Sequence, residues 1–212
     1  MNNDAKLKTK PNGVLVIVGT PIGNSMDLSA RGIEAFVNAD LVLAEDNRIT
    51  KKLSKIRNFK IKKLVSFNDY NESKKLSSVI KNIKDGNNVV LSSDAGMPLI
   101  SDPGYKLVNE CLKHDILIDV IPGPSSIITA IVTSGLATNN FYFAGFPIKK
   151  KQARIKSLSK LAEINTTIIW FESPRRILSF LNELIIVFGN RQAVVARELT
   201  KFYQEILRDD LV

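Results

Sequence analysis

The sequence predicts an α/β protein with two domains, and three observations carry this prediction. Short apolar runs alternate with segments of helical spacing along the N-terminal half of the chain. This alternation favours a largely parallel sheet that is covered by helices. The segment 122–126, rich in proline and glycine, interrupts the pattern, which restarts after Asn139. We therefore predict an N-terminal domain over 14–121, a linker region over 122–139 and a C-terminal domain over 140–212.

The elements of the N-terminal domain follow from the spacing of its apolar residues. Strands are predicted at 14–18, 41–44, 62–67, 89–91 and 116–121. Helices are predicted at 28–38, 46–57, around 76–83 and at 105–113, because their apolar residues recur on one side of a helix. Cys111 falls on the apolar side of the last of these helices, so we expect it in the core. The first thirteen residues are polar, and we predict a disordered tail there.

The linker region and the C-terminal domain show the same alternation, with more proline and glycine between the elements. Strands are predicted at 141–146, 166–171 and 193–196, and helices at 127–134, 149–161 and 177–188. Ser125 or Ser126 is expected to cap the first of these helices, because a hydroxyl oxygen can accept a bond from the free N–H groups of its first turn. Gly135 is expected to end it, since glycine adopts the left-handed backbone that closes many helices.

Composition and charge narrow the class of protein. The chain has 212 residues, of which 44 % are hydrophobic and 24 % charged, as is usual for a soluble globular protein. Its net charge of +9 favours partners with phosphate backbones or anionic membranes, although general enrichment in lysine, asparagine and isoleucine explains the charge equally well. The single cysteine excludes an intrachain disulfide and indicates a reducing compartment. The run 14–18 is too short for a signal peptide or a membrane span, so we predict a cytoplasmic protein without membrane contact.

Several loops with unusual composition follow predicted strands. They read GTPIGN at 19–24, SDAGMPLISDPG at 93–104, PGPSS at 122–126, ESPRR at 172–176 and ARELTK at 196–201. The loop 93–104 is the most informative, because its two glycines and two prolines give the backbone a special shape at the end of a buried strand. In an open α/β sheet, loops at the carboxyl ends of strands converge on one crevice. A ligand site is therefore expected there.

The absence of common nucleotide-binding and metal-binding motifs narrows the class of ligand. No loop matches GxGxxG or the phosphate-binding pattern GxxxxGK[ST], which disfavours a standard dinucleotide or nucleoside triphosphate site. His114 is the only histidine, so neither a histidine metal centre nor a Ser–His–Asp arrangement is expected. Asp94 and Asp102 could bind a hard cation, but the neighbouring glycines and prolines favour a small-molecule cradle. We therefore predict a nucleoside-like ligand and no metal.

Charged residues near the loops suggest where a polyanion would bind. Arg175 and Arg176 follow Pro174 at a predicted helix start, where cations oppose the helix dipole and where phosphate contact would explain them. Two basic clusters stand out, the first comprising Lys51, Lys52, Lys55, Arg57, Lys60, Lys62 and Lys63, and the second Lys149, Lys150, Lys151, Arg154, Lys156 and Lys160. Each cluster is either a solvated face or part of a track for a nucleic acid backbone.

Taken together and in this order, seven segments resemble the tetrapyrrole methylase superfamily. They are VGTPIGN (18–24), AEDNRITKKL (44–53), SDAGMPLISDPGY (93–105), PGPSS (122–126), FAGFPIKK (143–150), FESPRR (171–176) and ARELTK (196–201). The resemblance implies two α/β domains with S-adenosylmethionine in the cleft between them, and a homodimer. It also implies which residues bind the cofactor: Pro21, Asp94, Ala95, Gly96, Ile100, Ser101, Ser125, Ser126 and Ala196.

Within that superfamily the chain is similar to enzymes that methylate a cytidine ribose 2′-hydroxyl in the decoding region of 16S rRNA of the small ribosomal subunit. Such a transfer needs the hydroxyl aligned with the methyl group and help in removing its proton. Our candidates for this catalytic role are Lys201, Glu198 and Asp46. The candidates for RNA contact are Arg48, Lys149, Lys150, Arg154, Arg175 and Arg176. Two alternatives remain open, a corrinoid-precursor methyltransferase of the same fold and a non-catalytic RNA-binding assembly factor.

The chain departs from the family pattern at positions that are often histidine. The family usually has ED-T-R-H-T at 45–50, Y-H-E-H-N at 67–71 and ESPHR at 172–176, whereas this chain has no histidine in any of these segments. None of those histidines is therefore expected to be an indispensable base. Family chains also generally continue for several tens of residues past the position of Val212, so the C-terminal domain is either short here or truncated.

Overall fold

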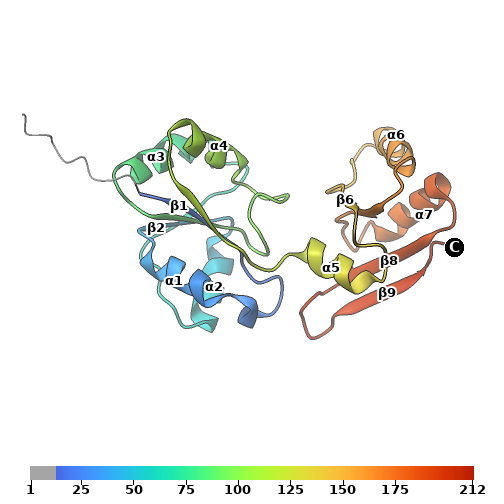
Figure 1. Cartoon of the computed structure of the whole chain (residues 1–212), viewed down its shortest axis with the longest axis horizontal. Coiled ribbons are helices and arrows are strands. Elements are labelled where there is room, and N and C mark those ends of the chain that lie inside the picture. Colours follow the sequence, from blue (N-terminus) through green and yellow to red (C-terminus); the bar gives the residue numbers. More distant parts are fainter. Residues whose placement is uncertain (1–12) are drawn as a thin grey trace, which may run out of the picture. The chain divides into compact units, whose positions relative to one another are not determined.

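The computed structural model describes residues 13–212 and divides into two compact units, Met1–Pro124 and Ser125–Val212 (Figure 1). The tail predicted over 1–13 lies outside the described residues except for Gly13. The division between the units falls inside the predicted linker region 122–139. Part of that region is the helix α5 (Ser126–Ser134), which packs against strands of the second unit.

The first unit is built on a five-stranded sheet in the order β3-β2-β4-β1-β5. Its strands are β1 (Leu15–Val18), β2 (Leu41–Ala44), β3 (Leu64–Ser66), β4 (Val89–Ser92) and β5 (Ile118–Ile121). Every neighbouring pair is parallel, with Leu15 opposite both Val89 and Ile118. The largely parallel sheet predicted from the sequence is thus confirmed.

Helices cover both faces of this sheet (Figure 1). They are the short 3₁₀ helix η1 (Ser25–Asp27), α1 (Ala30–Asn38), α2 (Asn47–Ile56), α3 (Glu72–Lys84) and α4 (Tyr105–Lys113). Side chains alternate between the faces along each strand. In β2, Leu41 and Leu43 join the core beneath α3 and α4, which includes Cys111 as predicted, whereas Val42 joins the core with α1. The near-continuous apolar strands are therefore explained by burial on two sides.

The order of the strands creates a switch point at β4. From β1 the chain moves outward to β2 and β3 through α1 and α2, and then returns to β4 and β5 through α3 and α4. As a result β4 lies between β2 and β1, but its following helix covers the opposite face from theirs. In open α/β sheets, ligands bind outside the carboxyl ends of the strands at such a point.

The second unit is also α/β. It contains α5, β6 (Phe141–Phe143), α6 (Lys151–Ala162), β7 (Thr167–Ile169), α7 (Ile177–Phe188), β8 (Gln192–Arg197) and β9 (Glu205–Asp210). Strands β6 and β7 pair in parallel, and β8 and β9 form an antiparallel hairpin. The core centres on Leu158, Phe180 and Leu184, with Trp170 packed edge-on against the Phe180 ring.

Two local details of the second unit bear on the sequence predictions. Ser125 is the residue that caps α5, accepting a bond from the Ile128 N–H at 3.4 Å, and Gly135 ends the helix in the left-handed conformation at φ 80°. Strand β9 was not predicted. Its sequence EILRDD is charged and mostly exposed, so pairing with β8 rather than local propensity makes it a strand.

Candidate functional site

Loops from three neighbouring strands meet at the carboxyl edge of the first unit's sheet. The loop after β1 and the loop after β4 are joined by a reciprocal backbone pair, in which the Thr20 N–H donates to the Gly96 carbonyl at 2.9 Å and the Gly96 N–H donates to the Thr20 carbonyl at 3.1 Å. The buried Thr20 hydroxyl adds a bond to the Ser93 carbonyl at 3.2 Å. Two loops that are more than seventy residues apart in sequence are thereby fixed together.

Glycine is required where the loop after β5 joins them. A Cβ atom placed on Gly19 would lie 2.7 Å from the Gly123 backbone, and one placed on Gly123 would lie 2.8 Å from the Gly19 backbone. Both distances are too short for any real contact with rigid backbone, so the loops after β1 and β5 pack main chain against main chain. The predicted convergence is confirmed within this unit for the loops at 19–24 and 93–104 and for residues 122–124 of the third loop.

The loop after β4 has a backbone that side chains rarely adopt. Leu99 and Ser101 have φ of 72° and 66°, alongside Gly96 at 84° and Gly104 at 126°. Left-handed backbone at residues other than glycine persists only where surrounding structure holds it, and it is concentrated at functional sites.

Glu72, which is only 4 % exposed, is one of the residues that hold the backbone of this loop in place. Its Oε1 accepts the N–H groups of Gly104 and Lys106, both at 3.2 Å. The sequence analysis did not single out this residue, because nothing in the local sequence distinguishes it from the solvated charges around it.

A group of carboxylates lies at the ends of β2 and β4. Asp94 accepts a bond from the Asp46 N–H at 3.0 Å, and Glu45 accepts one from the Asp94 N–H at 3.3 Å. The side chains of Glu45 and Asp94 thus brace the two loops against each other. Within residues 13–212, no group of three or more histidine, cysteine, aspartate or glutamate side chains is arranged to hold a metal ion.

The environment divides these carboxyls into two kinds. Burial raises the pKa of Glu45 and of Asp94. Burial together with the neighbouring Glu45 charge raises the pKa of Asp102 to about 6. The opposite holds for Asp46, whose pKa is lowered to about 2 by the hydrogen bonds it accepts from Arg48. The edge therefore offers hydrogen-bond acceptors and negative charge on a chain that is otherwise basic, which suits a ligand with hydroxyl donors and a positive centre.

The remaining residues predicted to bind the cofactor are divided between the units. In the first unit Pro21 is half-buried, and Ala95, Ile100 and Ser101 are exposed. The other three belong to the second unit, where Ser125 caps α5, Ser126 is the first residue of that helix and Ala196 is half-buried in β8. Ser101, Ile100 and Ala95 therefore sit with Asp94 and Gly96 on the loop after β4.

The catalytic candidates are engaged in ion pairs. Lys201 Nζ lies 3.1 Å from Glu198 Oε1 in the turn between β8 and β9, and both side chains are about half exposed. Asp46 caps α2 by accepting the Arg48 N–H at 2.8 Å, and its Oδ2 lies 2.6 Å from Arg48 Nη2. With a pKa near 2, Asp46 is a poor proton acceptor at neutral pH.

The candidates for RNA contact differ in their exposure to solvent and in whether their charge is paired with a carboxylate. Lys149, Lys150 and Arg175 are exposed, and the Arg48 side chain is 89 % exposed despite its pairing with Asp46. In contrast, Arg176 pairs with the buried Glu172 carboxylate at 2.7 Å. This ion pair explains why a cation is placed at the start of α7, where it opposes the helix dipole.

Arg154 has a structural role. Its guanidinium binds both oxygens of the buried Glu183 carboxylate, at 2.6 and 2.7 Å. It also donates to the carbonyls of Ile148 and Lys149, at 2.7 and 2.9 Å. These bonds hold the start of α6 against α7, and we leave Arg154 out of the RNA contacts proposed below.

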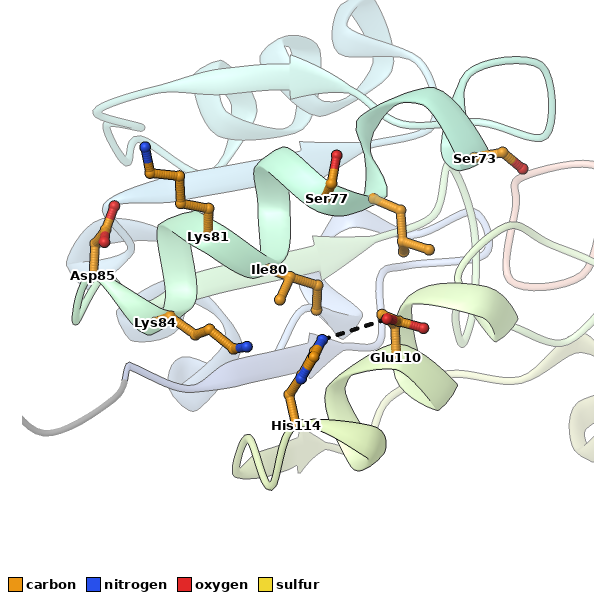
Figure 2. Close-up of a pocket in the computed structure, with 9 residues that line it drawn as sticks. Ser73, Ser77, Ile80, Lys81, Lys84, Asp85, Glu110 and His114 are labelled. Atoms are coloured by element: carbon orange, nitrogen blue, oxygen red, sulfur yellow. Dashed lines mark ion pairs between the residues drawn. The ribbon is translucent and has the colours of Figure 1, made fainter.

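A pocket of about 570 Å³ lies elsewhere, between α3 and α4 (Figure 2). Figure 2 shows Lys81, Lys84 and Asp85 along one side, and the 3.4 Å contact between Glu110 Oε1 and His114 Nε2 on the other. This pocket is open and of mixed charge, and no strand end contributes to it. We therefore place the candidate site at the carboxyl edge of the sheet, where strained and buried groups converge.

Comparison with known proteins gives a consistent family. A sequence profile described as "Tetrapyrrole (Corrin/Porphyrin) Methylases" matches residues 14–212. A protein from Thermotoga maritima, named ribosomal RNA small subunit methyltransferase I, is 44 % identical over 197 residues, which cover 92 % of this chain and 87 % of that protein. A protein of the same name from Rickettsia prowazekii is 44 % identical, over 93 % of this chain and 70 % of its own length.

Solved structures share the fold at low identity. A cobalt precorrin-4 methyltransferase superposes with a TM-score of 0.67 at 17 % identity, covering 94 % of this chain and 85 % of that one. A uroporphyrin-III C-methyltransferase from Thermus thermophilus superposes with a TM-score of 0.65 at 15 % identity, covering 94 % and 86 %. At such identities the likeness concerns the fold alone.

Proposed function

Because this chain belongs to the tetrapyrrole methylase family, among relatives named ribosomal RNA small subunit methyltransferase I, we propose that it transfers a methyl group from S-adenosylmethionine to ribosomal RNA of the small subunit. The acceptor in this proposal is the 2′-hydroxyl of a cytidine in the decoding region of 16S rRNA. A homodimer acting in the cytoplasm completes the proposal. No helix within residues 13–212 is long and apolar enough to cross a membrane.

The observation that carries the proposal is the convergence of three loops at the switch point of the sheet. The close packing of Gly19 on Gly123 and the backbone pair between Gly96 and Thr20 hold these three loops together in one arrangement. Asp94 and Glu45 offer acceptors for ribose hydroxyls, and the exposed Ala95 and Ile100 offer apolar surface for an adenine ring. These residues fit S-adenosylmethionine, which supplies a methyl group already activated by a positively charged sulfur.

The cofactor-binding residues of the proposal are those implied by the resemblance. In the first unit they are Pro21, Asp94, Ala95, Gly96, Ile100 and Ser101, and in the second Ser125, Ser126 and Ala196. The half-buried Pro21 and the exposed Ala95 and Ile100 would hold the nucleoside, and the carboxylates would balance the positive sulfur. The low pKa of Asp46 keeps it ionised throughout the working range of pH, so its part is to cap α2 and to hold Arg48.

The hydroxyl proton needs a carboxylate that accepts it, for which Glu198 and, as an added candidate, Asp102 are available, while Lys201 assists as a cation. Asp102 belongs to the same loop as Ser101 and Ile100, and its pKa of about 6 is close to the value at which a general base works best near neutral pH. The Lys201 ammonium would stabilise the developing alkoxide, and the neighbouring Glu198 carboxylate would orient this ammonium or accept the proton.

RNA contact in this proposal uses exposed cations. Lys149 and Lys150 precede α6, Arg175 precedes α7, and Arg48 lies in the first turn of α2. These side chains would neutralise phosphates, which positions the RNA without reading its sequence. The 2′-hydroxyl distinguishes RNA from DNA, so a DNA strand of the same sequence should not be methylated.

The test combines binding with transfer. Calorimetry first measures whether the protein binds S-adenosylmethionine, and the labelled methyl donor is then supplied with 30S subunits, naked 16S rRNA or a corrinoid precursor. We expect binding of the donor and label in RNA. Label in the corrinoid precursor alone would favour the tetrapyrrole-type activity, and RNA binding with no donor binding would favour a non-catalytic assembly factor.

A further inference from the structure

The turn between β8 and β9 displays two aromatic rings that folding does not explain. Phe202 is 93 % exposed and Tyr203 is 79 % exposed. The two rings contact each other edge to face, with their centroids 4.9 Å apart and their planes at 86°. Because both rings remain in water, they contribute almost nothing to a hydrophobic core. Their surface is therefore available for a partner.

The turn that carries these rings is held in a defined shape. The Lys201 N–H donates to the Glu198 carbonyl at 3.0 Å, and the Gln204 N–H donates to the Lys201 carbonyl at 3.2 Å. The Gln204 side chain accepts the Thr200 N–H at 2.7 Å. Glu198 and Thr200 both have left-handed backbone, with φ of 52° and 64°. This conformation is especially costly for Thr200, because its side chain is β-branched. A strained turn that fixes two exposed rings is typical of a functional site.

Charge favours a polyanionic partner. Lys201, which pairs with Glu198, directly precedes the rings, and the second unit as a whole carries twelve lysine and arginine residues against seven aspartate and glutamate residues. Positive charge beside exposed aromatic rings is the pattern by which proteins bind single-stranded nucleic acid, since bases stack on the rings while cations follow the backbone. A base inside a duplex is already stacked on its neighbours and offers the rings no face.

We propose that Phe202 and Tyr203 form a stacking platform for an unpaired base of the RNA substrate. This inference rests on the proposed function, because it names how the RNA would be held beside Lys201 and Glu198. The rings do not touch the reacting atoms, so they are positioning residues.

The experiment uses the full chain and a fluorescent single-stranded oligoribonucleotide, alone or annealed to its complement, with binding followed by anisotropy. The double variant Phe202→Ala with Tyr203→Ala should bind the single strand about tenfold more weakly and the duplex equally well, because stacking of one base is lost. Its affinity for S-adenosylmethionine should not change. The exchange variant, Phe202→Tyr with Tyr203→Phe, keeps both rings and should bind as the wild type does.

Two further controls make the result decisive. Leu178→Ala removes another exposed apolar side chain, on α7, and should leave RNA affinity unchanged. Binding to anionic lipid vesicles and the mass of the protein in solution are measured for the same variants. The proposal is overturned if the double alanine variant keeps its affinity for the single strand, loses affinity for duplex to the same extent, or instead loses vesicle binding or self-association.

The outcome separates this inference from the proposed function. If the wild-type protein methylates rRNA and the double alanine variant does so with unchanged KM, only the stacking platform is wrong. If the wild type binds single strands through the rings but transfers no methyl group, the platform stands and the proposed enzyme activity fails.

Discussion

Asp102 shows at the scale of one residue how burial sets the chemistry of a carboxyl group. Its folded-state pKa of about 6 exceeds the ordinary value of 3.8, so the folded protein binds this proton more tightly than the unfolded chain does. A raised carboxyl pKa stabilises the fold most below the unfolded value, and that stability is lost as pH rises through the folded value. The pKa values of Glu45 and Asp94 are raised in the same direction.

We therefore predict that the free energy of unfolding of the first unit falls as pH rises from about 4 to about 7. Asp102→Asn, which cannot ionise, should reduce this fall and make the protein more stable than the wild type at pH 7. Urea denaturation at a series of pH values measures both effects. The exposed Asp27→Asn serves as the matched control, and an unaltered slope in the Asp102 variant would contradict the assignment.

Lys201 carries the second prediction at this scale. If its ammonium stabilises the reacting oxygen, Lys201→Ala should lower the rate of methylation by about 100-fold or more, while the affinity for S-adenosylmethionine stays unchanged. Single-turnover rates and calorimetry measure the two quantities. Lys156→Ala, which removes an exposed lysine of α6, is the control. Full activity in the Lys201 variant would remove this residue from the catalytic candidates.

At the scale of elements, the predictions succeeded where local pattern decides the structure. The helices over 105–113 and 177–188 were placed to the residue, because their apolar spacing and the glycine or loop residues at their ends are read locally. Strand β9 was missed, since its charged sequence becomes a strand only by pairing with β8.

The same distinction between local and long-range information applies to the residues of the candidate site. The converging loops could be predicted, because glycine and proline mark them in the sequence. The partners of Arg154 and the clamp formed by Glu72 could not, since Glu183 is 29 residues from Arg154 and Gly104 is 32 residues from Glu72. Only the fold brings such pairs together.

The contact between two loops carries the third prediction. Gly123→Ala would place a methyl group 2.8 Å from the Gly19 backbone, which cannot move without shifting β1. We expect a loss of about 2 kcal/mol in unfolding free energy and at least tenfold weaker binding of S-adenosylmethionine. Gly135→Ala is the control, because it adds backbone strain at φ 80° but meets no atom within 4 Å. Unchanged cofactor affinity in the Gly123 variant would argue against a ligand at these loops.

The ion pair between α6 and α7 carries the fourth prediction. The Arg154–Glu183 ion pair is largely buried, with 19 % and 9 % of the side chains exposed. Glu183→Ala leaves the Arg154 guanidinium without its partner and should destabilise the second unit by about 2 kcal/mol. Lys113→Ala, which breaks the exposed pair with Glu110, should have a much smaller effect, because water screens exposed charges. Thermal unfolding compares the two, and equal effects would contradict a structural role for Arg154.

At the scale of the whole molecule, charge is distributed in a way that suits the proposed reaction. The chain as a whole carries a net charge of +9, yet the carboxyl edge of its main sheet gathers Glu45, Asp46, Asp94 and Asp102. A basic surface attracts the phosphate backbone of RNA, while the acidic edge suits a positively charged methyl donor. The two kinds of surface would suit the two substrates of the proposed transfer.

The position of the transferred methyl group tests the central claim most directly. The protein is incubated with 30S subunits and methyl-labelled S-adenosylmethionine, and the 16S rRNA is digested to nucleosides and analysed by mass spectrometry. We predict labelled 2′-O-methylcytidine among the nucleosides. In the undigested RNA, alkaline cleavage should fail at one cytidine of the decoding region. Label confined to a methylated base, or no label in the RNA at all, would contradict the account.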